Sequence, residues 1–187
     1  MDLDYKLTSN DDLTSLATQK SVATWNQLVE YVKKVPYGRT SDKSDLGLVI
    51  VENTGTCSSK HAFLKKIADL NHIPNVKLIL SIFRMNLLNT PKVASVLTNH
   101  QMGYMPEAHC YLKFNNECID VTSKHLDFSK IKHDIVEEIE IKPEQVITFK
   151  EEFHKKFIKD WIIKEDLTRS FEQIWDIREQ CIANLSK

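Results

Sequence analysis

GTCSSKHAFLKKIADL, residues 55–70, begins as a tight turn and continues as an amphipathic helix. Gly55 permits a backbone conformation that other residues resist, and Thr56 is a favourable residue type at a helix N-cap. Cys57 then falls in the first helical turn, where unpaired backbone N–H groups and the helix dipole stabilise an anion. A thiolate is such an anion, so this position predicts a reactive thiol with a lowered pKa. A buried cysteine that fills core space is the alternative interpretation.

Helical periodicity assigns a face to Cys57 and to the side chains that follow it. At about 100° per residue, Cys57 lies on the apolar arc and points toward the rest of the fold. Lys60 falls within the same arc, where a lysine is unfavourable. We expect Lys60 either to extend to solvent or to line a cleft and attract an anionic part of a substrate. Arg39, in the turn at residues 37–39, is a second candidate for this role.

Composition restricts the class of protein. The 187 residues carry a formal net charge of -1, with 42% hydrophobic and 27% charged residues, as in ordinary globular proteins. This balance gives no support for nucleic-acid or membrane binding, and no apolar run is long enough to span a bilayer. The four cysteines show no CxxC spacing, and the first residues form no apolar leader. We therefore expect a cytoplasmic protein with reduced thiols and no cofactor.

The remaining segments predict helices toward both ends of the chain and strands between them. Helices are expected over residues 21–35, near 92–99, and in two segments after Pro143 that are separated near 166–168. Strands are expected over residues 76–85, 109–114, 117–122 and 134–141. This order predicts a single α+β domain over residues 1–187. Its core spans about 20–142 and a helical extension spans about 143–187.

A two-residue turn at Asn115-Asn116 sets the register of the predicted hairpin. Residues that face each other across the hairpin, and residues two apart along a strand, point to the same side of a sheet. The facing pairs are Phe114 and Glu117, Tyr111 and Asp120, and His109 and Thr122. His109 and Asp120 therefore share a face and are diagonal neighbours, a separation of roughly 7 Å between backbones.

Cys57, His109 and Asp120 together supply the functional groups that thiol catalysis requires: a thiol, an imidazole and a carboxylate. A thiolate attacks an acyl carbon, and a histidine takes the thiol proton and later protonates the leaving group. A carboxylate orients the imidazole and stabilises its charged form. The trio predicts thiol-dependent acyl chemistry on an amide or ester, either hydrolysis or acyl transfer.

The order of these motifs resembles the transglutaminase-like superfamily, in a bacterial-type form. The matching residues are Gly55-Thr56-Cys57, Glu107-Ala108-His109 and Ile119-Asp120-Val121-Thr122, within about residues 50 to 122. The resemblance implies a papain-like core in which the cysteine helix packs on an antiparallel sheet. It also implies Cys57 as nucleophile, His109 as base and Asp120 as the orienting carboxylate, acting on a peptide, protein or small amide or ester substrate.

The sequence departs from the family pattern in two places. Cys110 stands where many members carry an aromatic residue after the histidine, and Tyr111, the next residue, is a candidate substrate contact. Val51 stands where papain-type enzymes have an oxyanion glutamine. The Cys57 backbone N–H and the Asn53 side chain are the candidate oxyanion donors.

Two other functions are compatible with the sequence. The first is a metal site, because zinc accepts cysteine and histidine ligands and Cys57 and His61 are four residues apart on a helix. Against it, His109 and Cys110 point to opposite faces of their strand, and no HExxH motif is present. The second is a binding module that keeps the fold without catalysis.

Overall fold

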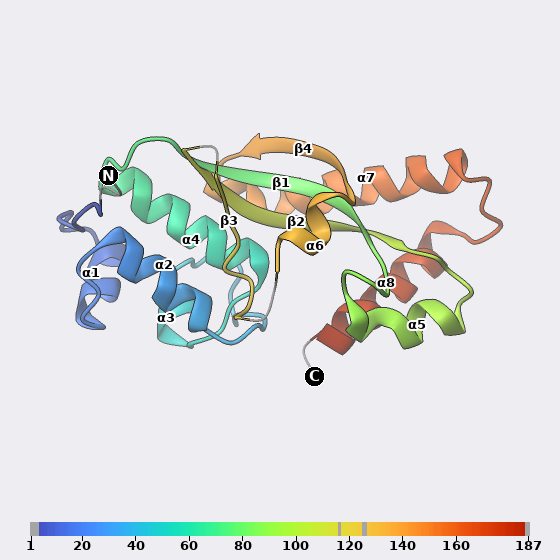
Figure 1. Ribbon diagram of the computed structural model, residues 1–187, viewed down its shortest axis with the longest axis horizontal. Coiled ribbons are helices and arrows are strands. Elements are labelled where there is room, and N and C mark those ends of the chain that lie inside the picture. The colour runs from blue at the N-terminus through green and yellow to red at the C-terminus, as the bar shows by residue number, and fades with distance from the viewer. Residues whose placement is uncertain (1–3, 116, 125–126, 186–187) are drawn as a thin grey trace. The chain divides into compact units, whose positions relative to one another are not determined.

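The computed structural model describes residues 4–115, 117–124 and 127–185 (Figure 1). Helices account for 47% and strands for 19% of the residues, which confirms the α+β class. Four strands form one sheet in the order β3-β2-β1-β4. They are β1 (Val76–Met85), β2 (Met105–Phe114), β3 (Glu117–Ile119) and β4 (Ile135–Ile141).

Segments that alternate along the sequence form two compact units. The first unit comprises Met1–Leu80, Cys110–Leu126 and Ile139–Ile147. The second unit comprises Ser81–His109, Asp127–Glu138 and Thr148–Lys187. The expected boundary between core and extension, near residue 143, lies inside the last segment of the first unit.

Helix α4 (Cys57–Leu70) is the central helix of the first unit. It contacts the other helices of this unit: α1 (Asp12–Gln19), α2 (Trp25–Lys34), α3 (Leu48–Val51) and the 3-10 helix η2 (Pro143–Val146) (Figure 1). The helix predicted over residues 21–35 begins at Trp25 because Thr24 is its N-cap, with a side chain that accepts the Gln27 N–H. Pro36 lies just beyond its C-cap Val35, as expected for a residue that ends helices.

The β2–β3 hairpin has the predicted register. Phe114 pairs with Glu117, and the two preceding residues of β2 pair with Cys118 and Ile119 in antiparallel order. Asn115 has a φ of 49°, a left-handed conformation that asparagine tolerates in tight hairpin turns. Asn116, the second residue of the predicted turn, lies outside the described residues. The returning strand ends at Ile119, three residues earlier than the predicted segment 117–122.

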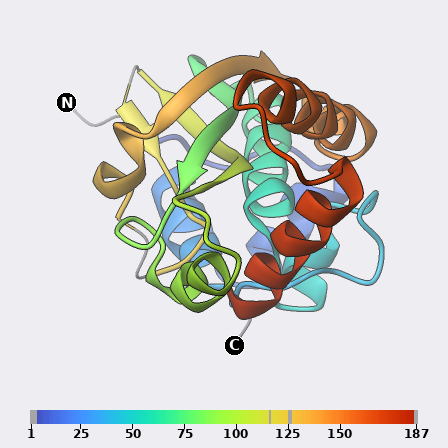
Figure 2. The same ribbon diagram turned by 90° about the vertical axis from the view of Figure 1, so that its right-hand side faces the viewer.

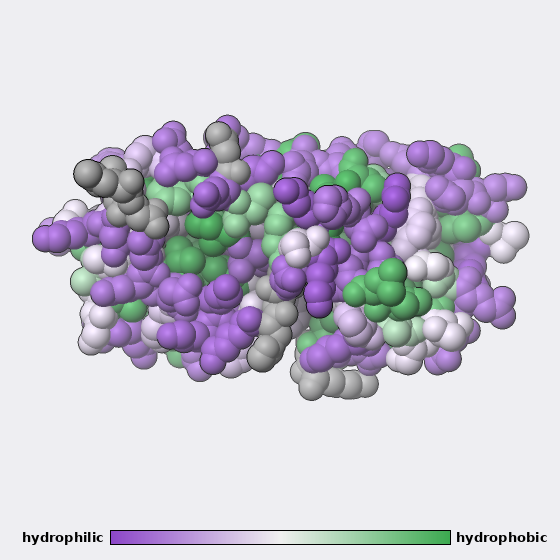
Figure 3. All heavy atoms as spheres, viewed as in Figure 1, coloured by the Kyte–Doolittle hydropathy of each residue, from purple (hydrophilic) through white to green (hydrophobic). Residues whose placement is uncertain are grey.

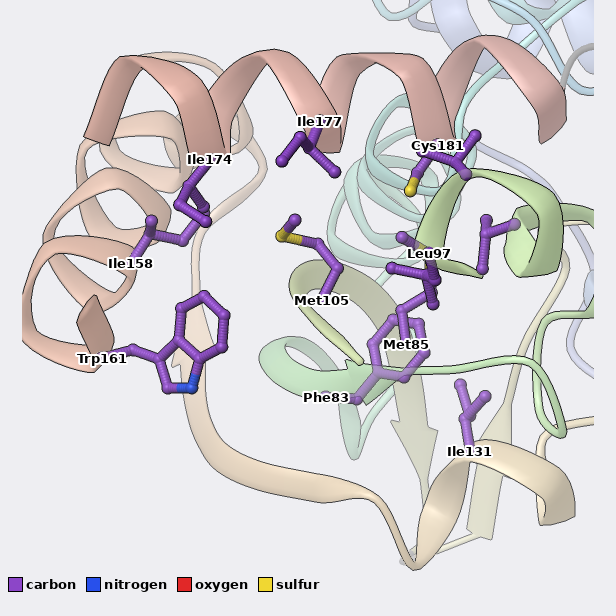
Figure 4. Packing of buried hydrophobic residues seen from close by; sticks show 12 residues of the cluster. Phe83, Met85, Leu97, Met105, Ile131, Ile158, Trp161, Ile174, Ile177 and Cys181 are labelled. Atoms are coloured by element: carbon purple, nitrogen blue, oxygen red, sulfur yellow. The ribbon is translucent and has the colours of Figure 1, made fainter. Parts of the chain in front are cut away.

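The second unit has its own hydrophobic core (Figure 4). Its helical elements are η1 (Pro91–Val93), α5 (Ala94–Asn99), α6 (Ser129–Lys132), α7 (Thr148–Lys164) and α8 (Phe171–Leu185). Helices α7 and α8 lie side by side (Figure 2). Ile158 and Trp161 of α7 and Ile174 and Ile177 of α8 enter the core, where Met105 of β2 also lies (Figure 4). The two C-terminal helices are therefore structural parts of this unit.

Hydrophobic side chains also reach the surface of the second unit. Leu87 and Leu88 are 50% and 79% exposed, in the loop between β1 and η1. A hydrophobic patch covers this loop in the space-filling view (Figure 3). Among the described helices, none combines the length and the apolar character needed to cross a membrane.

Candidate functional site

Cys57 is the first residue of α4, as the sequence predicts. The Thr56 side chain accepts the Ser59 N–H, and the Ser59 hydroxyl accepts the Thr56 N–H at 2.9 Å. This reciprocal capping box orders the first turn of a 14-residue helix. Cys57 is 8% exposed, so its sulfur lies at the positive end of an ordered helix with little contact to water.

Gly55 is required for a reason other than the predicted one. Its φ is not in the left-handed region, so backbone freedom does not explain it. A Cβ at this position would lie 2.8 Å from Cγ of Lys60, closer than real side chains approach. Gly55 also pairs with the 36–38 segment. The Gly38 N–H donates to the Gly55 carbonyl, and the Gly55 N–H donates to the Pro36 carbonyl. The glycine thus leaves space for the buried Lys60 side chain.

Lys60 neither reaches solvent nor lines an open cleft, so both expectations for it are corrected. Its side chain is fully buried, and its Nζ donates to the main-chain carbonyls of Val35, Val121 and Thr122. Burial lowers the pKa of Lys60 to about 8, while the negative charges of Asp120 and Cys57 act in the opposite direction. The amine consequently stays largely protonated at neutral pH.

His61 joins α4 to the segment that carries Asp120. Its Nε2 accepts the Val121 N–H at 2.9 Å, and its Nδ1 lies 2.7 Å from the Cys57 carbonyl oxygen. Because Nε2 accepts, Nδ1 carries the proton and donates it to that carbonyl. Both ring nitrogens therefore bond to backbone groups in a fully buried side chain. The sequence indicated His61 as a possible zinc ligand, four residues after Cys57 on the helix.

Asp120 lies directly after β3, in the first unit with Cys57. Its carboxylate accepts the Thr122 N–H at 2.9 Å. This hydrogen bond closes a local turn, which directs the chain away from the strand. The side chain is 2% exposed, and one oxygen lies 3.7 Å from Nε2 of His61. Asp120 is thus held next to the helix that bears Cys57 and Lys60.

His109 belongs to the second unit. It is 5% exposed, its ring meets the Phe83 ring edge-on at 5.9 Å between centroids, and its carbonyl accepts the Ser81 hydroxyl. Glu107, two residues earlier on β2, is also buried and forms a two-point ion pair with Arg178 of α8. Burial alone would raise the pKa of Glu107, but Arg178 and His154 outweigh it and hold that pKa below its usual range.

The other expected substrate contacts differ in their exposure. Tyr111 is fully buried, so its side chain is packed inside the protein and is not open to a substrate, which corrects the prediction. Asn53 and Arg39 are exposed. Asn53 has a φ of 50° in the turn before the cysteine helix, and Arg39 follows Gly38, which pairs with Gly55. The exposure of Asn53 and Arg39 is compatible with their predicted role as ligand contacts.

A metal site is not supported by the side chains that the structure places. Within residues 4–115, 117–124 and 127–185, no three histidine, cysteine, aspartate or glutamate side chains come together as metal ligands. His61, the proposed helical ligand, already bonds to backbone groups through both nitrogens.

Comparison with known proteins returned nothing similar: no protein-family model matches the chain, and no curated protein or solved structure matches it.

Sequence reasoning missed two features of this region. The carbonyl partners of Lys60 are 25, 61 and 62 residues away in sequence, and the Glu107–Arg178 pair spans 71 residues. For Lys60, the sequence signal was its position on the inward face of the helix, which indicates burial but not the partners. No local pattern marks Arg178 as the partner of Glu107.

Proposed function

We propose that this chain performs thiol-dependent acyl chemistry on an amide or ester, with Cys57 as nucleophile. In this proposal His109 is the base and Asp120 orients it, in a papain-like arrangement similar to that of the transglutaminase-like superfamily. Support comes from the order and spacing of the sequence motifs and from the predicted hairpin register, which three residue pairs follow.

One observation carries the proposal: Cys57 opens a capped helix beside a buried ammonium. The capping box fixes the N–H groups of the first turn, and Lys60 lies three residues along the same helix, where a Cys57 thiolate would raise the pKa of its amine. Both effects favour the thiolate, which is the nucleophilic form of cysteine.

The reaction proceeds by two acyl transfers. The thiolate forms an S–C bond to the acyl carbon, the bond to the amine or alcohol breaks, and the leaving group takes a proton from the His109 imidazolium. Water or an amine then attacks the thioester and loses a proton to His109, which releases the product and regenerates the thiolate. Asn53 and the Cys57 N–H are the candidate donors to the oxyanion.

The test is a screen of chromogenic amide and ester substrates, read by product release and by the mass of the intact protein. We expect turnover, and with slowly hydrolysed esters an acyl group on Cys57, both absent in Cys57→Ala. Cys110→Ala is the matched control, since it removes another buried thiol. Turnover that persists in Cys57→Ala would exclude this mechanism.

A second candidate function is an interaction module without catalysis. The favouring observation is the Leu87-Leu88 loop, whose two side chains are exposed although asparagine side chains fix the loop. Asn86 accepts the N–H groups of Leu88 and Asn89, and Asn89 bonds to Asp134. A Cys57 thiol of ordinary reactivity, together with loss of partner binding in Leu88→Asp, would favour this function.

A further inference from the structure

Lys60 presents an unusual arrangement of hydrogen bonds around a buried amine. The Nζ of an ammonium carries three N–H bonds, and here three main-chain carbonyls accept them. A neutral amine would have only two N–H bonds and would direct its lone pair at a carbonyl oxygen. At neutral pH, where the amine is largely protonated, the three carbonyls therefore match the three N–H bonds of the ammonium.

Among the described residues, the hydrogen-bond partners of this ammonium are neutral carbonyls, and no carboxylate forms a direct ion pair with it. A buried cation in such a position acts on nearby ionisable groups through the low-dielectric interior. The groups whose charges act on Lys60 are Cys57, on its own helix, and Asp120, on the segment after β3. The end of α2 faces it through the Val35 carbonyl.

We propose that Lys60 is a positioning residue whose buried ammonium stabilises the Cys57 thiolate and the Asp120 carboxylate. It acts on the reacting groups through its charge and, being fully buried, does not bind substrate. Its three carbonyl bonds also hold the Val35 and 121–122 segments against this helix. This inference rests on the proposed function, because it concerns the ionisation of the proposed nucleophile.

The first test measures the rate of Cys57 alkylation by iodoacetamide against pH in Lys60→Met. Removing a nearby positive charge should raise the midpoint of the rate profile by about one pH unit. At pH values below the midpoints of both proteins, Lys60→Met should therefore be alkylated about tenfold more slowly than the parent chain. Lys66→Met is the matched control, because it removes a lysine of the same helix whose amine is part-exposed and pairs with Glu144. Its profile should superimpose on that of the parent chain. A shift that is equal in both variants, or absent in Lys60→Met, would overturn the inference.

A second measurement keeps every bond of Lys60 in place and does not require Lys60→Met to fold. By linkage, a thiolate that Lys60 stabilises must in turn stabilise the ammonium. The Lys60 side-chain NMR signal should therefore titrate at lower pH in Cys57→Ala than in the parent chain. Equal titration midpoints in the two proteins would refute the coupling.

These measurements use no substrate, so they separate the two proposals. Coupling between Lys60 and Cys57 without amide or ester turnover would leave the inference standing and exclude the acyl chemistry. Turnover without coupling would support the acyl chemistry and overturn the role of Lys60.

Discussion

His61 and His109 are the two histidines that the sequence places near Cys57, and the hydrogen bonds of His61 assign it a structural role. The buried His61 ring bonds to the Cys57 carbonyl and to the Val121 N–H. His61→Ala leaves both backbone groups without their partner, at a cost of about 1–3 kcal/mol for each group. We expect urea denaturation to show this loss of stability. His133→Ala, at an exposed position, should change the free energy of unfolding by less than about 0.5 kcal/mol. Equal stability of the two variants would contradict a structural role for His61.

Lys60 also makes a prediction about stability and pH. Burial lowers its folded-state pKa from 10.5 to about 8. Above pH 8 the unfolded chain therefore holds a proton that the folded chain has lost, so the free energy of unfolding rises with pH up to about 10.5. The rise is on the order of a few kcal/mol, and below pH 8 the cost of the buried charge is fully present.

Urea denaturation at several pH values between 7 and 10.5 measures this contribution of Lys60. Other groups titrate in the same interval, so the slope is compared with that of Lys60→Met, which should lack the rise. Lys66→Met should retain it. A Lys60→Met protein with the same slope as the parent chain would show that folding does not lower the pKa of Lys60.

Single residues mark the limit of what the sequence predicts here. Helical periodicity correctly placed Lys60 on the inward face, but its partners come from distant segments that no local pattern identifies. Gly55 was correctly marked as special, yet its reason is the close approach of Lys60, which depends on tertiary packing. Tyr111 was assigned to the correct strand without a signal for its complete burial.

At the scale of elements, the N-terminus of α4 should stabilise both the fold and the thiolate. Thr56→Ala removes the cap, at a cost of about 1 kcal/mol, and frays the first turn that orders the N–H groups. Loss of the helix-end interaction, about 0.3–1 kcal/mol, should slow alkylation of Cys57 about twofold to fivefold near neutral pH. Thr24→Ala is the matched control, because Thr24 caps α2 in the same way. It should lower stability similarly and leave the Cys57 rate unchanged; an equal rate loss would indicate general destabilisation.

In the second unit, the Glu107–Arg178 pair should hold α8 against β2. Arg178→Met leaves a buried carboxylate without its cation, which typically costs about 3–5 kcal/mol. Adding Glu107→Gln removes that charge, so the double variant should be more stable than Arg178→Met alone. Thermal denaturation of the variants completes a double-mutant cycle. A double variant that loses the sum of both single effects would show that the two residues do not interact.

The elements themselves were largely predictable because each has a strong local signal. The strand at Val76–Met85 matches its predicted bounds, and the capped helix begins at Cys57 as expected. The end of β3 was not predictable, because Asp120 diverts the chain by accepting the Thr122 N–H. That hydrogen bond depends on the rotamer of one side chain, and no hydrophobic pattern in the sequence indicates it.

At the scale of the whole molecule, the sequence suggested a core followed by an appended helical extension. The structure groups alternating segments of the chain into two compact units, and α7 and α8 supply core residues of the second unit together with β2. Local patterns carry no information on which distant segments share a core, because helices α7 and α8 would have the same amphipathic pattern in either arrangement.

The four cysteines provide an internal comparison for the central claim that Cys57 is the nucleophile. Cys110 is buried, and Cys118 is exposed and serves as the accessible reference thiol. Cys181 is buried too, and its burial and the nearby Glu107 raise the pKa of its thiol to about 11. Only Cys57 combines a helix N-terminus with a neighbouring ammonium.

The most direct measurement is peptide mass mapping after brief alkylation of the full chain with iodoacetamide at about pH 6, where free thiols, with pKa values near 8.5, react slowly. We expect Cys57 to be modified first, ahead of the more exposed Cys118. The Cys57 rate should fall strongly in His109→Ala, and less in Asp120→Asn, which leaves the imidazole in place but poorly oriented. Slower labelling of Cys57 than of Cys118, or a Cys57 rate that is indifferent to His109, would contradict the account.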